Sequence, residues 1–224
     1  MVRQWVLPIF LALVSMGSVA KDKVQIDPNF MVVLREVNGA NKEDFGYKQI
    51  PPSSVTLPNG ESILMSGAWY DMLGDMHIRF VTDSDLTMTN LSEEEFAALG
   101  LTPEQAVDIA VANIKHRYGE PKVAQWQDGI MLVGGDSADV NSSYFLDFAL
   151  WQGLLKKHPE GLVVGVPMRG GLMFAPLSDK HAVESMQRDI HGLFEAAGRE
   201  RVSSALYLFR DNTWSVFQQA APTK

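Results

Sequence analysis

Cysteine is absent from the 224-residue chain. Composition alone therefore excludes disulfide bonds, a thiol nucleophile and a lipid anchor attached through cysteine. A chain of this size can bury a core large enough to be stable without disulfide bonds. The absence of cysteine is thus compatible with an exported protein.

Long hydrophobic runs are also absent, apart from one near the N-terminus. Residues 6–16 are almost wholly apolar, Arg3 precedes them, and Ser18-Val19-Ala20 follows with small side chains. This run of about 11 residues is too short to span a bilayer, which requires about 20 residues in a helix. The segment 1–20 therefore predicts a secretory signal that is cleaved after Ala20, with a short membrane anchor as the alternative. Cleavage would leave a mature chain of about 204 residues. The simplest location for such a protein is a Gram-negative periplasm.

Positive charge is scarce, with 19 Lys and Arg residues against 27 Asp and Glu residues. The net charge is −8 at pH 7, and loss of Arg3 with the signal would make it about −9. An acidic surface repels nucleic acid phosphates, and Lys156-Lys157 is the only adjacent basic pair. We therefore expect no nucleic acid partner. Because 46% of the residues are hydrophobic, we expect a folded globular chain.

Recurring patterns of strand, turn and strand predict antiparallel hairpins. Residues 55–65, 123–133, 163–175 and 205–217 each place two apolar runs around a turn that contains Gly or Asn. Further strands are expected at 30–34 and 77–82. Capping boxes at 92–95 and 102–105 predict two helices that end at glycines. Two more helices are expected at about 142–157 and 180–197.

These elements predict an α+β fold, with a mixed or mainly antiparallel sheet built from hairpins and with helices packed on one face of it. The segments 129–131 and 171–173 occupy equivalent places, which suggests a ββα duplication; common packing rules explain the similarity equally well. We expect residues 21–56 to form an N-terminal extension with a strand and a loop, 57–217 to form the α+β domain, and 218–224 to form a flexible tail.

Signatures of the common catalytic and cofactor sites are missing. No GxSxG, HExxH or Walker sequence occurs, and Gly134-Gly135 lacks the third glycine of a dinucleotide-binding loop. The five histidines show no zinc-ligand spacing. We expect no cofactor and no metal, while a catalytic site assembled from scattered carboxylates stays open.

The segment after Gly134-Gly135 contains three candidate binding residues, Asp136, Asp139 and Asn141. Two carboxylates would repel a phosphate, and their spacing does not match a calcium loop. The simpler interpretation is that the glycines allow a bend and that Asp139 or Asn141 caps the following helix.

Three aromatic residues are further candidates. Trp69, Tyr70 and Trp151 could line a pocket for a sugar or another ligand, although such residues more often pack in a core. Trp151 lies in the predicted helix 142–157, which is apolar on most of its circumference. Such a helix is either buried on most sides or presents one face to a partner.

Several segments together resemble the bacterial YtpQ-like family. They are 77–83 (HIRFVTD), 110–114 (AVANI), 129–133 (GIMLV), 163–167 (VVGVP) and 172–174 (LMF). The resemblance covers about residues 57–217 and implies a single α+β domain with no established activity. The export signal departs from the family, whose members are mostly cytoplasmic, and no functional residues carry over.

The hypothesis that follows is an exported protein that acts by binding another protein. One specific version is an immunity protein that neutralises an exported toxin, because charge complementarity would speed the encounter of an acidic inhibitor with a basic enzyme. The alternatives are a cell-envelope hydrolase with scattered carboxylates and a small-ligand carrier that uses Trp69 and Tyr70. No transmembrane span is expected in the mature chain.

Overall fold

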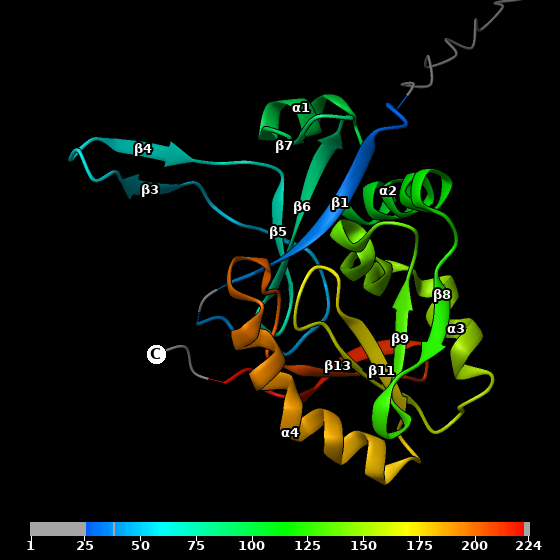
Figure 1. The fold of residues 1–224 in the computed structure, drawn as a ribbon. Coiled ribbons are helices and arrows are strands. Elements are labelled where there is room, and N and C mark those ends of the chain that lie inside the picture. Colours follow the sequence, from blue (N-terminus) through cyan, green and yellow to red (C-terminus); the bar gives the residue numbers. More distant parts are fainter. Residues whose placement is uncertain (1–25, 38, 222–224) are drawn as a thin grey trace, which may run out of the picture.

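The computed structural model describes residues 26–37 and 39–221. They form two antiparallel sheets, one above the other in Figure 1, and a separate two-stranded hairpin. Helices make up 32% of the described residues and strands 34%, so neither type dominates, and the predicted α+β class is confirmed. The predicted signal segment 1–20, with its cleavage site after Ala20, lies outside the described residues.

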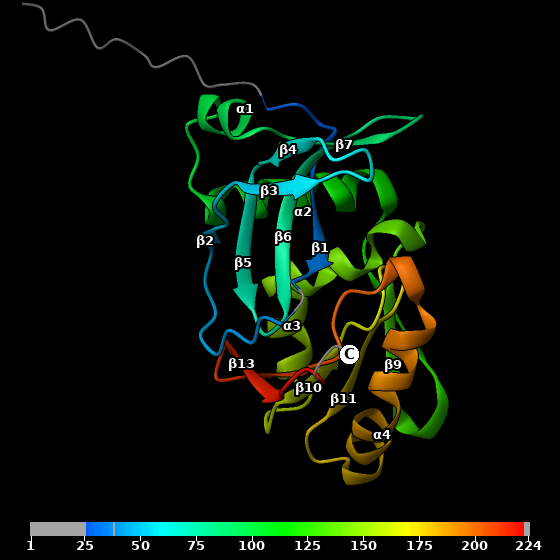
Figure 2. The same cartoon turned by 90° about the vertical axis from the view of Figure 1, so that its left-hand side faces the viewer.

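The N-terminal sheet is built around one long strand, β6. Its strands, in sheet order with β7 paired to β6, are β1 (Phe30–Glu36), β6 (Met76–Asp83), β5 (Trp69–Leu73), β2 (Lys48–Gln49) and β7 (Met88–Asn90). Strands β5, β6 and β1 run side by side in Figure 2. Strands β1 and β2 come from the segment 21–56, so this segment supplies part of the sheet.

One face of the N-terminal sheet is apolar and packs on two helices, α1 (Glu93–Ala98) and α2 (Pro103–Tyr118). Phe80 of β6 stacks on Phe96 of α1, with ring centroids 4.7 Å apart. Both predicted capping boxes are formed, at Ser92 and at Thr102, and they fix where the helices begin.

The opposite face of the N-terminal sheet is polar near the middle of β6. Side chains alternate along a strand, so His77 and Arg79 point away from Phe80. Directly paired residues of antiparallel strands share a face. Arg35 is paired with His77, and Trp69 is paired with Arg79, so all four side chains lie on this face.

The C-terminal sheet contains the three predicted C-terminal hairpins, all of which are confirmed. Its strands, in sheet order, are β13 (Thr213–Gln218), β12 (Leu206–Arg210), β10 (Leu162–Gly165), β11 (Leu172–Pro176), β9 (Met131–Gly134) and β8 (Lys122–Gln125). Asp211 and Asn212 both have positive φ, as a two-residue hairpin turn requires. Asp128 also has positive φ, in the short 3₁₀ turn Gln127–Gly129 that joins β8 to β9.

Helices cover both faces of the C-terminal sheet, so the prediction that they cover one face is wrong. Helix α4 (Lys180–Ala196) packs on the face that carries Val163 and Leu206. Helix α3 (Phe148–Leu155) lies on the face that carries Val164 and Phe209. Strands of this sheet are apolar on both sides, and each side therefore requires its own cover.

The predicted helix 142–157 is in fact two helices, which is a second correction. A 3₁₀ helix, η2 (Ala138–Leu146), is followed by α3, and Asp147 interrupts the helical backbone between them. The Asp147 carboxylate accepts a hydrogen bond from the Leu150 amide at 3.2 Å and caps α3. Tertiary hydrogen bonds hold η2 separately, because Ser143 Oγ donates to Val32 O at 2.8 Å.

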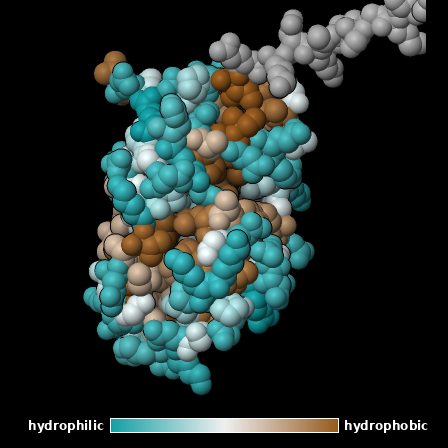
Figure 3. All heavy atoms as spheres, turned by 90° about the vertical axis from the view of Figure 1, so that its right-hand side faces the viewer, coloured by the Kyte–Doolittle hydropathy of each residue, from teal (hydrophilic) through white to brown (hydrophobic). Residues whose placement is uncertain are grey.

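Helix α3 lies on the side of the molecule shown in Figure 3, where apolar side chains form a band across the middle. Its residues Trp151 and Leu154 are buried, whereas Phe148, Leu150 and Leu155 are only partly buried. The helix therefore buries one apolar stripe and leaves the other partly open to solvent.

A buried polar cluster joins the two sheets. Asp75, in the turn between β5 and β6, accepts hydrogen bonds from the hydroxyls of Ser203 and Tyr207, the latter at 3.0 Å. Ser203 precedes β12 of the C-terminal sheet, and Tyr207 lies in it. Near the C-terminus, the Ala221 amide donates to Ser204 Oγ at 3.0 Å, whereas 222–224 of the predicted tail lie outside the described residues.

The predicted hairpin 55–65 is confirmed as β3 (Ser53–Thr56) and β4 (Ser62–Met65), and it projects from the body as an arm (Figure 1). Every residue of both strands is exposed, including Leu64 at 70%. Across residues 26–37 and 39–221, no helix is long and apolar enough to cross a membrane.

Candidate functional site

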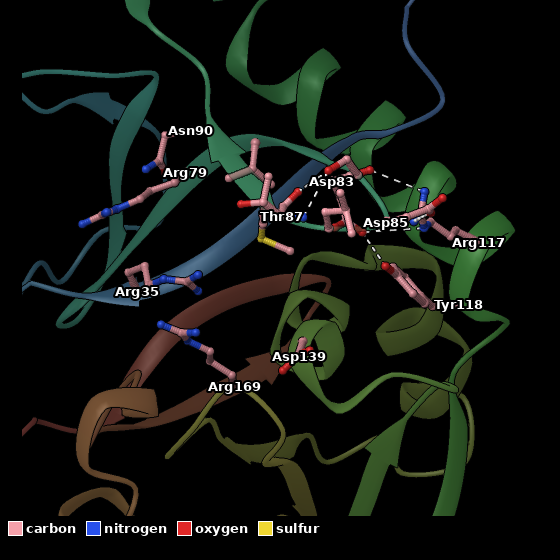
Figure 4. Close-up of a pocket in the computed structure, with 14 residues that line it drawn as sticks. Arg35, Arg79, Asp83, Asp85, Thr87, Asn90, Arg117, Tyr118, Asp139 and Arg169 are labelled. Carbon is pink, nitrogen blue, oxygen red and sulfur yellow. Dashed lines mark hydrogen bonds and ion pairs between the residues drawn. The ribbon is translucent and has the colours of Figure 1, made fainter.

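A polar cleft of about 690 Å³ opens between the polar face of the N-terminal sheet and the loops above the C-terminal sheet (Figure 4). We call it the arginine cleft. Figure 4 shows Arg35, Arg79 and Arg169 at one end, which we call the arginine end. Asp83, Asp85, Arg117 and Tyr118 gather at the other end, and Asp139 projects from η2.

Arg79 is held in place by two neighbours on the same face of the sheet. Its guanidinium lies 4.3 Å from the centre of the Trp69 ring, which is a cation–π contact. Its Nε–H donates to Nε2 of His77 at 2.8 Å. Because Trp69 and His77 are 9% and 4% exposed, they form a fixed support beneath a half-buried arginine.

Arg35 and Arg169 reach the cleft from different sheets. Arg35, near the end of β1, donates from Nη1 to the carbonyl of Leu34 at 2.7 Å. Arg169 lies in the loop between β10 and β11. Its carbonyl accepts from the Ser142 amide at 2.7 Å, and its own amide donates to Glu200 O at 3.0 Å. The Nε of Arg169 is buried and, within the described part of the chain, has no hydrogen-bond partner.

The positive charge at the arginine end is not neutralised by the protein. None of the three guanidinium groups forms an ion pair with a carboxylate of residues 26–37 or 39–221. Burial, and then the charges of Arg169 and Arg79, lower the pKa of Arg35 from 12.5 to about 10. Burial and Arg169 also lower the pKa of Arg79. The positive charge of Arg169 thus disfavours the charges of both Arg35 and Arg79.

His77 is neutral in this environment. Burial, followed by the charges of Arg79 and Arg35, lowers its pKa from 6.5 to about 3. A neutral imidazole can accept the Nε–H of Arg79, whereas a protonated one cannot. We therefore assign His77 as a positioning residue for Arg79.

The far end of the cleft is an internally paired cluster. Arg117, near the end of α2, lies 3.0 Å from Asp85 and 3.7 Å from Asp83. Tyr118 donates its hydroxyl hydrogen to Asp83. These contacts satisfy Arg117, so it is not equivalent to the three arginines at the arginine end.

The structure separates the three candidate residues of the segment after Gly134-Gly135. Asp139 is exposed and lines the arginine cleft. Asp136 lies outside the cleft and forms an exposed ion pair with Lys122 at 3.2 Å. Asn141 accepts a hydrogen bond from the Gly135 amide at 2.9 Å.

The glycines before these residues serve a turn, but the expected helix cap is not made by Asp139 or Asn141. A Cβ on Gly135 would lie 2.3 Å from the Tyr144 hydroxyl and 2.7 Å from the carbonyl of Tyr118. The turn is therefore closely packed, and the hydrogen bond from the Gly135 amide to Asn141 stabilises it. No side chain caps η2, and α3 is capped by Asp147.

The three candidate aromatic residues lie in three different environments. Trp69 supports Arg79 from below and does not line the cleft itself. Tyr70 points to the opposite face of β5, where its ring lies 5.6 Å from that of Phe96. Trp151 is 0% exposed, and its indole N–H donates to Phe145 O at 2.9 Å, so it belongs to the core.

Arg35, Arg79 and Arg169 were not among the site residues predicted from the sequence. The alternation of 77–82 contained a usable signal, because a strand with His77 and Arg79 on one face and Ile78 and Phe80 on the other has one polar side. No local pattern connects this strand to Arg169, because the two are 90 residues apart and meet only through the packing of the two sheets.

Groups of His, Asp and Glu suited to a metal ion are absent from the part of the chain that the structure describes. No protein-family model, curated protein or solved structure matches the chain. The resemblance to the YtpQ-like family therefore stays a prediction.

Proposed function

We propose that this chain is an exported binding protein and that its arginine cleft takes a small ligand with a compact anionic group. Phosphate, sulfate and carboxylate groups share the chemistry that guanidinium groups recognise through paired N–H donors. This proposal develops the small-ligand alternative, with the arginines in place of Trp69 and Tyr70 as the contacting residues.

The observation that carries the proposal is the unneutralised charge of Arg35, Arg79 and Arg169. Arg169 contributes to lowering the pKa of both Arg35 and Arg79, so the repulsion among these half-buried guanidinium groups destabilises the unliganded protein. An anion between them would remove that repulsion and would provide a partner for the buried Nε of Arg169. Electrostatic repulsion of this kind, with perturbed pKa values in a cleft, is characteristic of binding sites.

The size of the cleft favours a small molecule over a bare ion. Sites for small molecules typically measure about 300–1,000 Å³, and this cleft, at about 690 Å³, lies within that range. An inorganic anion would fill only the arginine end, so the ligand extends further along the cleft.

Thermal unfolding in the presence of anions tests the proposal. A ligand that binds only the folded state raises its stability by about 2.7 kcal/mol at a hundredfold excess over Kd. We expect inorganic phosphate or sulfate to raise the Tm of the protein relative to chloride at equal ionic strength. Arg35→Gln, Arg79→Gln and Arg169→Gln should each abolish the increase.

Arg199→Gln is the matched control, because Arg199 is exposed and lies outside the cleft. It should keep the full increase in Tm. An increase that survives in all three cleft variants would show that anions bind elsewhere and would refute the proposal.

A second candidate function, binding of another protein, is favoured by the β3–β4 arm. Val55, Ile63, Leu64 and Met65 are all exposed on it, and an isolated two-stranded hairpin is marginally stable in water. We propose that the arm completes its sheet against a protein partner. The acidic charge of the chain favours a basic partner, and an exported toxin is one such partner.

Crosslinking with the purified candidate partner tests the second function. Leu64→Glu, at 70% exposure, should abolish the crosslink, and Val123→Glu, on the exposed strand β8, should keep it. Equal crosslinking of both variants would exclude the arm as the surface that binds the partner.

The hydrolase alternative has less support, because two of the three carboxylates of the cleft, Asp83 and Asp85, are already paired with Arg117.

A further inference from the structure

The arginine cleft has opposite charges at different places along its length. Within residues 26–37 and 39–221, the three guanidinium groups of the arginine end form no ion pair. The remaining lining carries the carboxylates of Asp83, Asp85 and Asp139 and the single guanidinium of Arg117. Figure 4 shows Asp83 and Asp85 across the cleft from Arg35 and Arg79, with Asp139 nearer to Arg169. A ligand that is only anionic would meet repulsion from these carboxylates.

Asp139 is the carboxylate of the cleft that has no cation of its own. Within residues 26–37 and 39–221, Asp83 and Asp85 form ion pairs with Arg117, and Asp139 forms none. Its backbone lies close to that of Arg169, because Ser142 donates to the Arg169 carbonyl and a Cβ on Gly170 would lie 3.4 Å from Ala138. The closeness of the two segments has not produced an ion pair between their side chains.

The other residues that line the cleft, apart from Tyr118, are uncharged. Ser84, Thr87 and Asn90 are polar, whereas Val81, Leu86 and Met88 are apolar. Ser84 Oγ is already engaged with the carbonyl and the amide of Thr87, at 2.8 and 3.1 Å, which fixes the shape of the loop. A lining of this mixed character suits a short, uncharged connection between two charged groups of a ligand.

From this arrangement we propose that the ligand is dipolar, with a phosphate or sulfate group held by Arg35, Arg79 and Arg169 and a primary amine held by Asp139. The proposal rests on the proposed anion-binding function and names the class of ligand. An ammonium group has three donors, and a carboxylate with free acceptor sites is its natural partner. Asp139 contributes specificity, while the arginines contribute most of the affinity.

The test compares two series of compounds by isothermal titration calorimetry on the full mature chain. One series contains aminoalkyl phosphates with two, three and four carbons, and the other contains alkyl phosphates of the same lengths. At the best length we expect the amine to increase affinity by up to about tenfold, the upper range for an ion pair at an exposed carboxylate. A maximum at one length would measure the separation of the two subsites.

Asp139→Asn should remove the tenfold difference and leave the affinity for the alkyl phosphates unchanged or slightly higher. Asp136→Asn is the matched control, since Asp136 is three residues away and outside the cleft, and it should keep the full difference.

The results separate this inference from the proposed function. If alkyl phosphates bind and the amine adds nothing at any length, the dipolar ligand is refuted while anion binding stands. A tenfold difference that persists in Asp139→Asn also refutes the inference, because another group then holds the amine. If neither series binds, the proposed function fails, and the inference fails with it.

Discussion

Arg79 and His77 are joined by a hydrogen bond of 2.8 Å in which the arginine donates and the imidazole accepts. They lie two residues apart on one face of β6, so the strand itself brings them together. The bond requires a neutral imidazole, and burial together with Arg79 and Arg35 keeps His77 neutral by lowering its pKa to about 3. The orientation of Arg79 therefore depends on the protonation state of His77.

Stability should fall in acid because of His77. The folded-state pKa, about 3, lies below the ordinary value of 6.5, so the unfolded chain binds a proton in this window and the folded chain does not. The His77 contribution should be absent above pH 6.5 and should lower stability as the pH falls toward 3, by at most about 1.4 kcal/mol per pH unit. Urea unfolding at pH 7 and at pH 4.5 measures this loss.

The His77→Gln variant tests the cause of that pH dependence. Its side-chain carbonyl can accept from Arg79 without titrating, so part of the acid destabilisation should disappear. His191→Gln, at an exposed position of α4, should keep the wild-type dependence. Identical acid sensitivity in wild type and His77→Gln would contradict the assignment.

The like charges at the arginine end should lower the stability of the unliganded protein. Arg169→Gln removes one of three like charges that disfavour each other, so we expect a gain of roughly 0.5 kcal/mol together with loss of anion binding. Urea unfolding without added anion measures the gain, with Arg199→Gln as the reference. A clear loss of stability would mean that Arg169 serves the fold and not the site.

The buried cluster of Asp75, Ser203 and Tyr207 should hold the two sheets together. Asp75→Ala leaves the buried Tyr207 hydroxyl without its carboxylate partner, and we expect a loss of about 2–4 kcal/mol. Asp108→Ala, at an exposed position of α2, should change stability by less than about 0.5 kcal/mol. Equal effects of the two substitutions in urea unfolding would show that the cluster contributes little.

Two glycine substitutions test whether the Gly134-Gly135 segment is a closely packed turn. Gly135→Ala would place a methyl group 2.3 Å from the Tyr144 hydroxyl, so we expect destabilisation of about 1–3 kcal/mol. Gly153→Ala, in helix α3 with nothing within 4 Å, should stabilise the protein by up to about 1 kcal/mol. Thermal unfolding distinguishes these opposite signs, and a harmless Gly135→Ala would contradict the account of the turn.

The elements that the sequence predicted well are those with local signals. The turn at Asp211-Asn212 and the capping boxes at Ser92 and Thr102 depend on residues a few positions apart, and all were confirmed. The break at Asp147 was missed, because the apolar pattern continues through it and the tertiary bonds that hold η2 are not local.

The candidate site could be predicted only in part. Asp139 was named among the candidates and lies in the cleft, whereas Arg35, Arg79 and Arg169 come from three distant segments. Each of these arginines looks like an ordinary surface residue in its own segment. Their common site depends on strand register and on the packing of one sheet against the other, which a single sequence does not display.

A crystal soaked in tungstate, a heavy analogue of phosphate and sulfate, tests the anion-binding account most directly. The account predicts an anomalous difference peak at the arginine end, within hydrogen-bonding distance of Arg35, Arg79 and Arg169, and loss of that peak in Arg169→Gln. Occupied tungstate sites elsewhere on the protein, with none between these three arginines, would contradict it.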